Sequence, residues 1–327
     1  MLGYLSRRLG YFAVLMVVAA FLSYLLAATA LSPRVYFEAR QPRPPAAQID
    51  AQLAAIGLDP RQPVLVRFAH WAEHAVRGDL GRSIGGGSVD DEFGRRIGVS
   101  LRLLVLGTTL GTGLGVLVGM WSAVRQYRLS DRTVTLLAFV LLSMPTFLLA
   151  LLLKIGALAL NQTSGRQLIS FTGEETPGMR GSFGTLFADR AVHLLLPTLS
   201  IGLATVASYS RYQRSAMLDV LGADFLRTAE AKGLSRRRVL IKHGLRTALI
   251  PMSTFFSFGF LGVLTGATFT EKIFGWHGMG EWFIDSINNN DVNAVMAVNL
   301  FAAGTVLLSG LLADLLHAAL DPRVRRG

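Results

Sequence analysis

The stretch from Gly222 to Pro251 combines an amphipathic pattern with many basic side chains, and it lies between two long apolar runs. Asp224 is a candidate N-cap, residues 225–232 are expected to form two helical turns, and Gly233 supplies a C-terminal stop. Ser235 can then cap a second basic helix that runs toward Pro251. These residues are suited to binding another protein at close range through charged side chains.

Three positions in the first of these helices carry little or no side chain, namely Ala229, Ala231 and Gly233. Small side chains allow the surface of another protein to come close to the helix backbone. The segment is also too polar and too short to cross a bilayer, which takes about 20 apolar residues. We therefore interpret it as a docking helix.

Residues that could make or break bonds are scarce. No phosphate-binding Gly-x-x-x-x-Gly-Lys-Ser/Thr loop occurs, and none of the four lysines follows a glycine. The chain has no cysteine, which excludes disulfides, thiolate catalysis and cysteine-based metal sites. His70 and His74 have the i, i+4 spacing of a helical metal pair, with Glu73 between them, but no third ligand follows at a diagnostic spacing. We expect no catalytic residue and no metal site.

The elements that must position the docking helix are membrane spans. Hydrophobic residues make up 51% of the 327 positions and charged residues only 16%. Pro145 and Pro197 lie inside two of the apolar runs, where we expect kinks or late helix starts. Six runs approach the length needed to cross a bilayer: Leu9–Leu31, Leu101–Val124, Thr133–Leu160, Val192–Ser210, Thr247–Thr270 and Ala294–Ala318.

Basic residues gather on alternate connections between these runs, as expected for the cytoplasmic side of a membrane. Residues 125–132 hold three arginines after the second run, and residues 211–246 hold nine basic residues after the fourth. Both chain ends are basic, whereas Ile273–Asn293 has three acidic residues and no Lys or Arg. Six spans with both termini cytoplasmic satisfy this pattern. The net charge of +11 is then mostly topology with some attraction to anionic lipid, and nucleic-acid binding is a poor interpretation.

The first span resembles a cleavable signal peptide, because Arg7 and Arg8 precede it and Ala28-Thr29-Ala30 ends it. Its apolar stretch is longer than a signal core of about 7–15 residues, so we expect an uncleaved anchor.

The segment from Ser32 to Val99 is expected outside the membrane as a small helical cap, too short and too polar for a large core of its own. Helical spacing appears at Ile49–Ile56 and Pro63–Val76, and Gly85–Gly87 is a turn. One face of the second helix is apolar and comprises Val64, Phe68, Trp71 and Ala75.

Two features inside the spans allow a structural or a functional interpretation. Glycines recur every four residues along the second span at Gly107, Gly111, Gly115 and Gly119, and we expect them to permit close helix packing rather than to line a substrate path. Lys154 lies within the third span, so it either extends its ammonium toward the outer interface or faces a cavity.

The connection after the fifth span, Phe274, Gly275, Trp276, His277 and Gly278, alternates glycines with aromatic rings. Trp276 could anchor the membrane interface. Alternatively, the loop contacts a delivering binding protein or forms an external gate. Both interpretations stay open.

Five motifs, in this order, make the chain resemble the permease subunits of dipeptide and oligopeptide ABC importers almost from end to end. They are Tyr4-Leu5-Ser6-Arg7-Arg8-Leu9, Gly78-Asp79-Leu80-Gly81-Arg82-Ser83, Arg227-Thr228-Ala229-Glu230-Ala231-Lys232-Gly233-Leu234, Phe274-Gly275-Trp276-His277-Gly278-Met279-Gly280, and the terminal Leu312-Ala313-Asp314-Leu315-Leu316 with Leu320-Asp321-Pro322-Arg323.

The resemblance implies an all-α polytopic membrane protein of six transmembrane helices with the type I importer permease (MetI-like) fold. It divides the chain into residues 1–31 (N-terminus and first span), 32–99 (external segment) and 100–327 (a five-helix core with the cytoplasmic coupling segment 215–246). Within that segment it implies a coupling helix that contacts an ATPase. Its residues are Ala223, Asp224, Phe225, Leu226, Arg227, Thr228, Ala229, Glu230, Ala231, Lys232 and Gly233.

Here the chain departs from the general importer signature, which opens with Glu-Ala-Ala. Arg227 stands where that Glu is expected and Thr228 where the first Ala is, a version common in peptide-type members. No role of the missing carboxylate can be carried over. We expect Phe225, Leu226 and Ala229 to make the apolar contact, with Arg227 and Lys232 at its rim.

The implied partners are a second homologous permease, two cytoplasmic ATPases that use ATP and magnesium, an external binding protein, a peptide substrate and membrane lipid, in a bacterial inner membrane. No cofactor is expected on this chain. The same architecture imports nickel chelates and other small solutes, so the substrate stays open. A self-sufficient secondary transporter would also explain six spans, but it would not need the docking helix. A membrane-embedded enzyme lacks support, because no nucleophile–base pair or paired intramembrane carboxylates occur.

Overall fold

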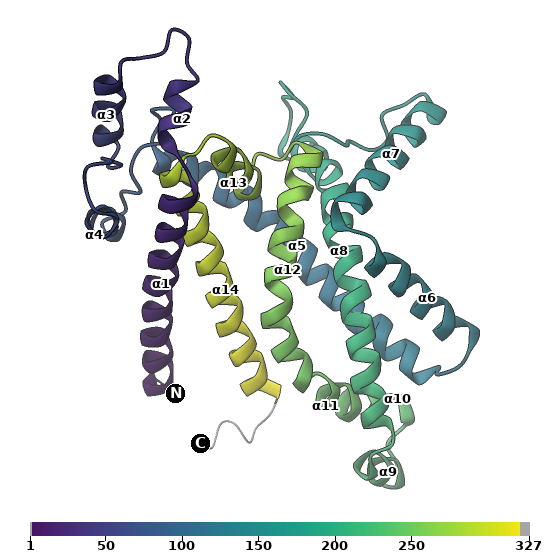
Figure 1. Ribbon diagram of the computed structural model, residues 1–327. Helices are drawn as coiled ribbons and strands as arrows, with labels where there is room; N and C mark the ends of the chain where they lie inside the picture. Colours follow the sequence, from purple (N-terminus) through teal and green to yellow (C-terminus); the bar gives the residue numbers. More distant parts are fainter. Residues whose placement is uncertain (1, 321–327) are drawn as a thin grey trace. The chain divides into compact units, whose positions relative to one another are not determined.

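The computed structural model describes residues 2–320, except for the side chains of residues 2–6, 254 and 257–266, and it is almost entirely helical (Figure 1). Within this range the backbone forms no strand, and its one isolated β-bridge joins Arg82 to Ser88. The all-α prediction is confirmed. The helices are α1 (Leu2–Ala30), α2 (Pro33–Glu38), α3 (Ala46–Ala55), α4 (Val64–Val76), α5 (Val89–Val124), α6 (Leu129–Ser143), α7 (Thr146–Ser164), α8 (Phe183–Leu221), α9 (Asp224–Ala231), α10 (Arg236–Val239), the π-helical turn η1 (Leu240–Leu245), α11 (Arg246–Ala248), α12 (Ile250–Phe274), α13 (Met279–Asn288) and α14 (Val292–Leu320).

Five described helical segments are long and apolar enough to cross a membrane: Arg7–Ala30 of α1, and the whole of α5, α7, α8 and α14. The predicted span Thr247–Thr270 corresponds to α12, and many of its side chains lie outside the described residues. The structure therefore supports a polytopic membrane protein, and the count of six spans stays a prediction. The basic tail at Arg323, Arg325 and Arg326 also lies outside the described residues.

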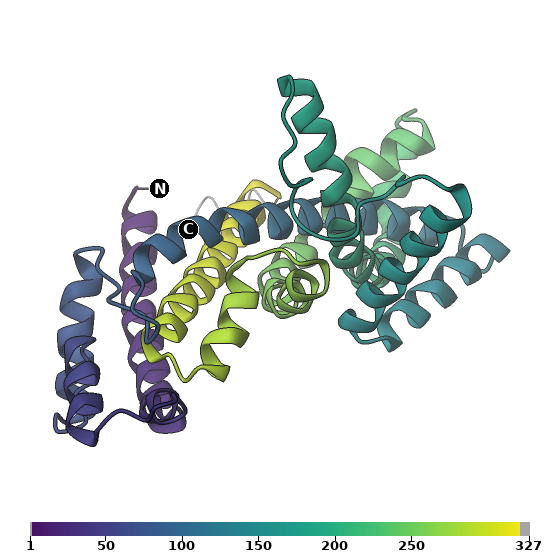
Figure 2. The same ribbon diagram turned by 90° about the horizontal axis from the view of Figure 1, so that it is seen from above.

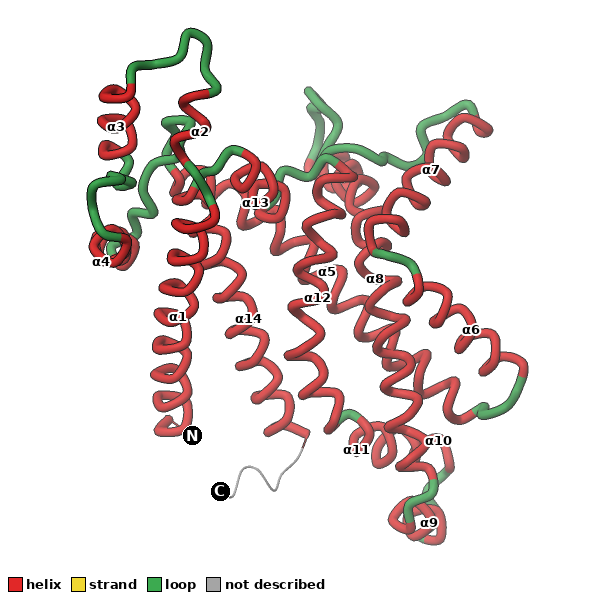
Figure 3. Tube along the Cα trace, in the orientation of Figure 1, coloured by secondary structure: helices red, strands yellow, loops and turns green. Residues whose placement is uncertain are grey.

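The predicted run Thr133–Leu160 forms two helices, because the backbone breaks between α6 and α7 (Figure 3), and the late helix start expected at Pro145 is confirmed. Met144 is extended, and Pro145 is the N-cap of α7. Proline disfavours helical backbone at the residue before it and has no N–H to continue a helix. Pro197, in contrast, lies inside α8, which continues through it.

Two other boundaries differ from the predictions. Helix α5 begins at Val89, so it extends into the stretch expected to be an external segment up to Val99. Helix α8 begins at Phe183 rather than Val192, where Ser182 accepts a hydrogen bond from the backbone N–H of Thr185. Both extensions contain charged residues, which end an apolar run in the sequence although the helix itself continues.

The chain forms two compact units. The first comprises the chain up to Ser100 together with His277–Leu307, and the second comprises Leu101–Trp276 together with the chain from Leu308 onward. The external segment therefore shares a unit with α1, α13 and the beginning of α14.

The core of the first unit is built around aromatic residues of α1 and α4. Tyr24 is 1% exposed, and its ring centroid lies 5.6 Å from that of Phe68 and 5.9 Å from that of Trp71. All four residues of the predicted apolar face of α4 belong to this core or pack against it, which confirms that face. The short helices gather beside the end of α1 (Figures 1 and 2). Burial against α1 and α14 replaces the independent core that this segment is too small to form.

In the second unit, the glycine stripe of α5 lies directly against α8. A Cβ atom on Gly107 would lie 2.6 Å from Ile201 Cγ2, and one on Gly111 would lie 2.6 Å from Thr205 Cβ. The contact continues one turn at a time, because a Cβ on Gly115 would lie 2.7 Å from Tyr209 Cβ. Real Cβ atoms do not approach so closely, so only glycine fits. The packing interpretation of this stripe is confirmed.

Candidate functional site

The predicted coupling helix corresponds to α9, an eight-residue helix that follows the end of α8 (Figure 3). Its N-cap is Ala223, without a side-chain hydrogen bond, so the prediction of Asp224 as N-cap is wrong by one position. As the first helical residue, Asp224 instead places its carboxylate near the positive end of the helix dipole. The predicted stop is confirmed, because Gly233 has φ +84°, a left-handed conformation that favours glycine.

The two large apolar residues of α9 point to different surroundings. The Leu226 side chain is buried at 5% exposure, whereas Phe225 is 43% exposed. Leu226 thus packs within the chain itself, and its contact with a partner stays a prediction. Successive helix residues are rotated by about 100°, so these neighbours cannot share one face. Phe225 and the half-buried Ala229 remain available on the outer side, one helical turn apart.

The charged residues of α9 are open to solvent. The side chain of Arg227 is 79% exposed and that of Asp224 is 95% exposed, with 3.8 Å between their charged atoms. An ion pair as exposed as this contributes little to folding. Lys232 is exposed as well. These positions fit the rim that the sequence predicts, although contact with an ATPase stays a prediction.

The predicted second basic helix toward Pro251 is present over residues 236–248, with a π-helical turn in its middle. Ser235 precedes α10 as predicted, but it makes no side-chain capping bond, and the chain then passes through η1 and α11 before α12 begins at Ile250. Gly244 lies in this π-helical turn. A Cβ on Gly244 would lie 3.1 Å from Met217 Cε and 3.9 Å from Leu226 Cδ1, so the turn packs closely on both α8 and α9.

A further contact ties the coupling segment to the last helix. The guanidinium of Arg246 donates hydrogen bonds to the carbonyl oxygens of Leu320 at 3.2 Å and Ala319 at 3.3 Å. These carbonyls belong to the end of α14, where backbone acceptors lack helical partners and a cation is favourable. Arg246 was part of the basic cluster, but its partner could not be read from the sequence.

A second arginine of the basic segment is paired within the chain. Asp131 accepts hydrogen bonds from Arg214 Nε at 2.7 Å and Nη2 at 2.9 Å, from the backbone N–H of Tyr127 at 3.0 Å, and from the hydroxyl of Ser122. Asp131 lies in the first turn of α6, ahead of its apolar stretch. Hydrogen bonding from the guanidinium holds the pKa of this carboxyl well below its usual range. The pair joins the α5–α6 connection to α8.

The loop after α12 begins in the second unit with two buried rings. Phe274 and Trp276 are each 1% exposed. Gly275 has φ +65°, and a Cβ there would lie 3.3 Å from Thr172 Cγ2, while Gly173 donates its N–H to the Phe274 carbonyl at 2.8 Å. Trp276 is therefore a core residue and not an exposed interface anchor.

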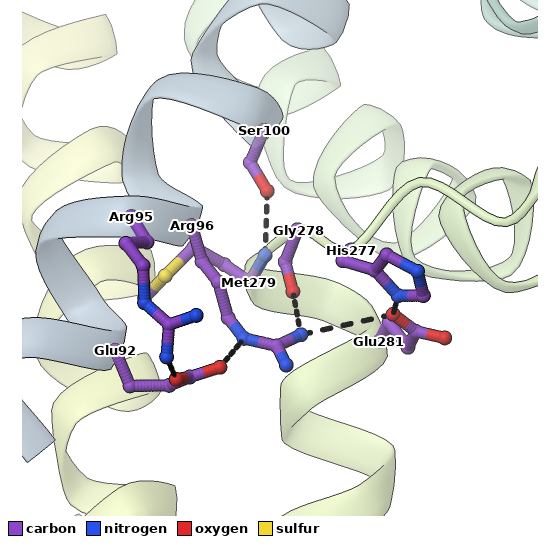
Figure 4. Close-up of polar contacts among 8 residues, drawn as sticks. All are labelled: Glu92, Arg95, Arg96, Ser100, His277, Gly278, Met279 and Glu281. Carbon is purple, nitrogen blue, oxygen red and sulfur yellow. Dashed lines mark hydrogen bonds and ion pairs between the residues drawn. The ribbon is translucent and has the colours of Figure 1, made fainter. Parts of the chain in front are cut away.

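The loop continues in the first unit, where His277 is exposed and Gly278 is buried. Figure 4 shows the acidic and basic side chains around it. His277 Nδ1 lies 2.7 Å from Glu281 Oε2, and Arg96 approaches the same oxygen at 3.7 Å while donating to the Gly278 carbonyl at 3.3 Å. Glu92 pairs with Arg96 from the other side. Of the five candidate gate residues, only His277 exposes its side chain.

A hydrogen bond between helices completes this cluster. The backbone N–H of Met279, the first residue of α13, donates to Ser100 Oγ at 2.7 Å (Figure 4). The start of α13 is thereby capped by α5, since no cap comes from its own Gly278. The arrangement holds the loop firmly, and it suits a contact surface better than a hinge.

The external motif at residues 78–83 also has a structural partner that the sequence did not reveal. Asn293 Nδ2 donates to the carbonyls of Ile56 and Arg82, both at 2.9 Å. Gly81 has φ +92°, and a Cβ there would lie 3.3 Å from the same amide nitrogen. The two glycine positions were the available signal, because only a tight turn against a neighbour requires them.

Lys154 makes a contact that neither sequence interpretation anticipated. Its half-buried ammonium donates a 2.6 Å hydrogen bond to the Ile273 carbonyl, in the last turn of α12. A cation is favourable at a helix C-terminus. A cavity role for Lys154 remains a prediction that nothing here tests.

One histidine of α4 and the neighbouring Glu73 are engaged locally. His74 Nδ1 lies 3.2 Å from Asp79 Oδ2, and Glu73 accepts a 2.8 Å hydrogen bond from Arg77. Among the described residues, no three His, Cys, Asp or Glu side chains form a group that could hold a metal ion.

Several helices long and apolar enough to cross a membrane, together with a short exposed amphipathic helix, are consistent with a membrane transport component. The sequence profile of the binding-protein-dependent transport system inner membrane component matches residues 115–326, and the chain belongs to this family. As such it is a multi-pass membrane protein that works with a separate binding protein, and it is not an enzyme.

Three relatives show the same kinship over most of the chain. The oligopeptide transport system permease protein OppB of Mycobacterium tuberculosis is 56% identical over 325 residues, covering 99% of each chain. The oligopeptide permease AppB of Bacillus subtilis is 36% identical, covering 80% of this chain and 81% of the relative. The dipeptide permease DppB of Escherichia coli is 35% identical, covering 84% of each. The resemblance to peptide importer permeases is confirmed.

Proposed function

We propose that this chain is the permease subunit of an ATP-driven importer of oligopeptides or dipeptides in a bacterial inner membrane. The observation that carries the proposal is end-to-end similarity to an oligopeptide permease, combined with the exposed outer face of α9. The basic connections place α9 and both termini on the cytoplasmic side. On that basis residues 1–31, 32–99 and 100–327 correspond to the anchor, the external segment and the core.

The chemistry of energy supply lies outside this chain. The proposed assembly contains two cytoplasmic ATPases, which use ATP and magnesium, a second homologous permease that makes a heterodimer, and an external binding protein. Phe225 and Ala229 supply the apolar contact with an ATPase, and Arg227 and Lys232 its charged rim. This is a smaller contact than the sequence suggested, because Leu226 belongs to the chain's own packing.

The described contacts explain how movement of α9 reaches the membrane. Leu226 inserts beside Gly244, which also contacts Met217 of α8. Arg246, just beyond, is bonded to the end of α14. A displacement of α9 by closing ATPases therefore moves α8 and the end of α14 with it, and the bundle switches between outward and inward access by rigid-body rocking.

For the loop after α12 we propose that His277 and the adjoining backbone of Gly275 and Gly278 meet the binding protein or form the external gate. His277 is the exposed side chain of this loop, and the ion pairs of Glu281 and Arg96 fix its position. Phe274 and Trp276, at the start of the loop, are buried and hold that part of the chain in the second unit.

The test is affinity purification of the tagged full complex in mild detergent, with mass spectrometry of the subunits recovered. The variant Ala229→Arg places a bulky charge on the outer face of α9, and Ala188→Arg places the same charge on an exposed position near the other end of α8. We expect ATPases to be recovered with the parent and with Ala188→Arg, and to be lost with Ala229→Arg. Equal recovery from all three would contradict the docking role of α9.

Substrate class needs a separate measurement. Radiolabelled di- and oligopeptides should be taken up by proteoliposomes that contain the complete importer and its binding protein. This transport should require ATP on the side of the membrane that carries the ATPases. Uptake of a nickel chelate instead of peptides would leave the architecture intact and overturn the peptide assignment.

A further inference from the structure

A pocket between α6 and α8 carries a basic group that the proposed transport mechanism does not use. Its volume is about 490 Å³. On α6 its lining residues recur at i, i+4 and i+7, and on α8 they share one face over three turns. The lining comprises Thr135, Phe139, Leu142, Ser208, Arg211, Tyr212, Arg214, Ser215 and Leu218.

The two arginines of this pocket differ in their partners. Arg214 is neutralised by its two hydrogen bonds to Asp131. Arg211 lies over the ring of Phe139, 4.2 Å from its centroid, and makes no ion pair with a carboxylate among the described side chains. Stacking occupies the flat face of a guanidinium and leaves its edge of N–H donors for an anion. The pocket thus holds one uncompensated positive charge.

Hydroxyl groups stand beside this charge. Ser208 and Ser215 flank Arg211 on α8 one turn before and one turn after, and Tyr212 follows it. The Tyr212 ring is fixed against Phe255 of α12, with 3.8 Å between ring centroids. Hydroxyl donors around a guanidinium are the groups that bind phosphate oxygens.

The position of the pocket along α8 indicates which kind of phosphate it would bind. The apolar run of α8 ends at Ser210, and Arg211 follows directly. The pocket residues from Ser208 to Leu218 rise by about 15 Å, so they pass from the edge of the hydrocarbon into the headgroup layer, which is about 5–8 Å thick on each side. The other half of the pocket is apolar, and Phe139 of α6 is 50% exposed beside it. Leu136 and Val140 extend this exposed apolar surface along α6.

From these features we propose that the α6–α8 pocket binds one phospholipid with an anionic headgroup. Its phosphate lies on the edge of Arg211 among the hydroxyls, and its acyl chains cover Phe139 and the exposed face of α6. The proposal depends on the membrane embedding of the chain and not on which solute it imports, so the two can fail separately.

The test is native mass spectrometry of the complete importer in detergent, with phosphatidylglycerol or phosphatidylcholine added at matched concentrations. We expect one tightly held phosphatidylglycerol for each copy of this chain and no comparable retention of phosphatidylcholine. In the Arg211→Gln variant, retention should weaken about tenfold, as for loss of one charge-assisted hydrogen bond. Arg132→Gln removes an exposed arginine near the start of α6 that does not line the pocket, and it should have no such effect.

Four results would overturn the proposal. The first two are equal retention of both lipids by the parent and equal losses of lipid retention in the two variants. The third is displacement of the lipid by inorganic phosphate alone. The fourth is displacement of the lipid by transported peptide, together with a raised KM for peptide transport in Arg211→Gln. The last two would assign the pocket to a free anion and to the transport path, respectively. The headgroup comparison uses the parent complex, so it remains decisive if Arg211→Gln fails to assemble.

Discussion

Asp291 accepts two hydrogen bonds through its Oδ2 atom, one from the hydroxyl of Ser83 at 2.5 Å and one from the backbone N–H of Ile84 at 3.1 Å. Asp291 precedes α14, whereas Ser83 ends the glycine-containing motif of the external segment, 208 residues earlier. The carboxylate is only 4% exposed. The same residue caps α14, because its Oδ1 accepts the N–H of Ala294 at 3.2 Å.

Replacement of Asp291 by alanine should loosen the external segment. The change leaves the N–H groups of Ile84 and Ala294 without partners, so we expect a loss of about 3 kcal/mol in local stability. Limited proteolysis of the purified complex should then cut within residues 32–88 sooner than in the parent. Asp91→Ala, at an exposed acidic position in the first turn of α5, is the control and should be cut like the parent. Equal protection of the Asp291 variant would contradict this account.

The contact between α5 and α8 makes a sharp prediction about two nearby glycines. At Gly111 a Cβ would lie 2.6 Å from Thr205 Cβ, whereas at Gly113 nothing lies within 4 Å. Gly111→Val should therefore lower the yield of monodisperse protein and the thermal midpoint, with an overpacking cost of about 1–3 kcal/mol or more. Gly113→Val inserts the same side chain into the same helix and should be tolerated. If both variants behave alike, helix propensity and not packing explains the stripe.

The ion pair of Asp131 and Arg214 should be costly to break from one side. The side chain of Asp131 is 4% exposed and that of Arg214 is 27% exposed, so Asp131→Asn leaves a half-buried guanidinium without its counter-charge. We expect the free energy of unfolding to fall by about 3 kcal/mol. The double variant Asp131→Asn with Arg214→Gln should recover part of that loss, and additive losses would show that the two residues are not coupled.

The lowered pKa of Asp131 also determines how the contribution of this residue to stability depends on pH. A carboxyl whose pKa is depressed by folding stabilises the protein above its unfolded pKa of about 3.9, and that contribution is lost as the pH falls toward the lower folded value. The difference in thermal midpoint between the parent and Asp131→Asn should thus be constant from pH 8 to pH 6 and should shrink in acid. A difference that already changes between pH 8 and pH 6 would contradict this assignment.

The two neighbouring apolar residues of α9 should give opposite phenotypes. Phe225→Ala removes an exposed ring, so the affinity for ATPase subunits should fall while the thermal midpoint of the isolated permease stays the same. Leu226→Ala empties a buried site beside Gly244 and should cost about 2–4 kcal/mol. Thermal unfolding and quantitative pull-down of the same preparations separate the two effects. A stability loss in Phe225→Ala with unchanged binding would reverse the assignment.

The sequence by itself determined the class of the molecule, because each of the features involved is local. Apolar runs long enough for a bilayer, basic connections and a glycine repeat follow from chain composition and helical period alone. The stop at Gly233, the break at Pro145 and the apolar face of α4 belong to the same group, since each depends on backbone preferences or spacing within a few residues.

The tertiary structure alone decided which of these residues face a partner and which face the chain. Phe225 and Leu226 are equivalent in sequence, because both are large apolar residues of one short helix. The sequence also allows Trp276 to be an interface anchor, whereas the structure buries it in a loop that packs against Thr172. The long-range pairs, Ser83 with Asp291 and Arg214 with Asp131, join segments that no local rule brings together. A charge or ring has the same local pattern whether it is buried or exposed. Its neighbours are fixed only when distant helices pack and desolvate it.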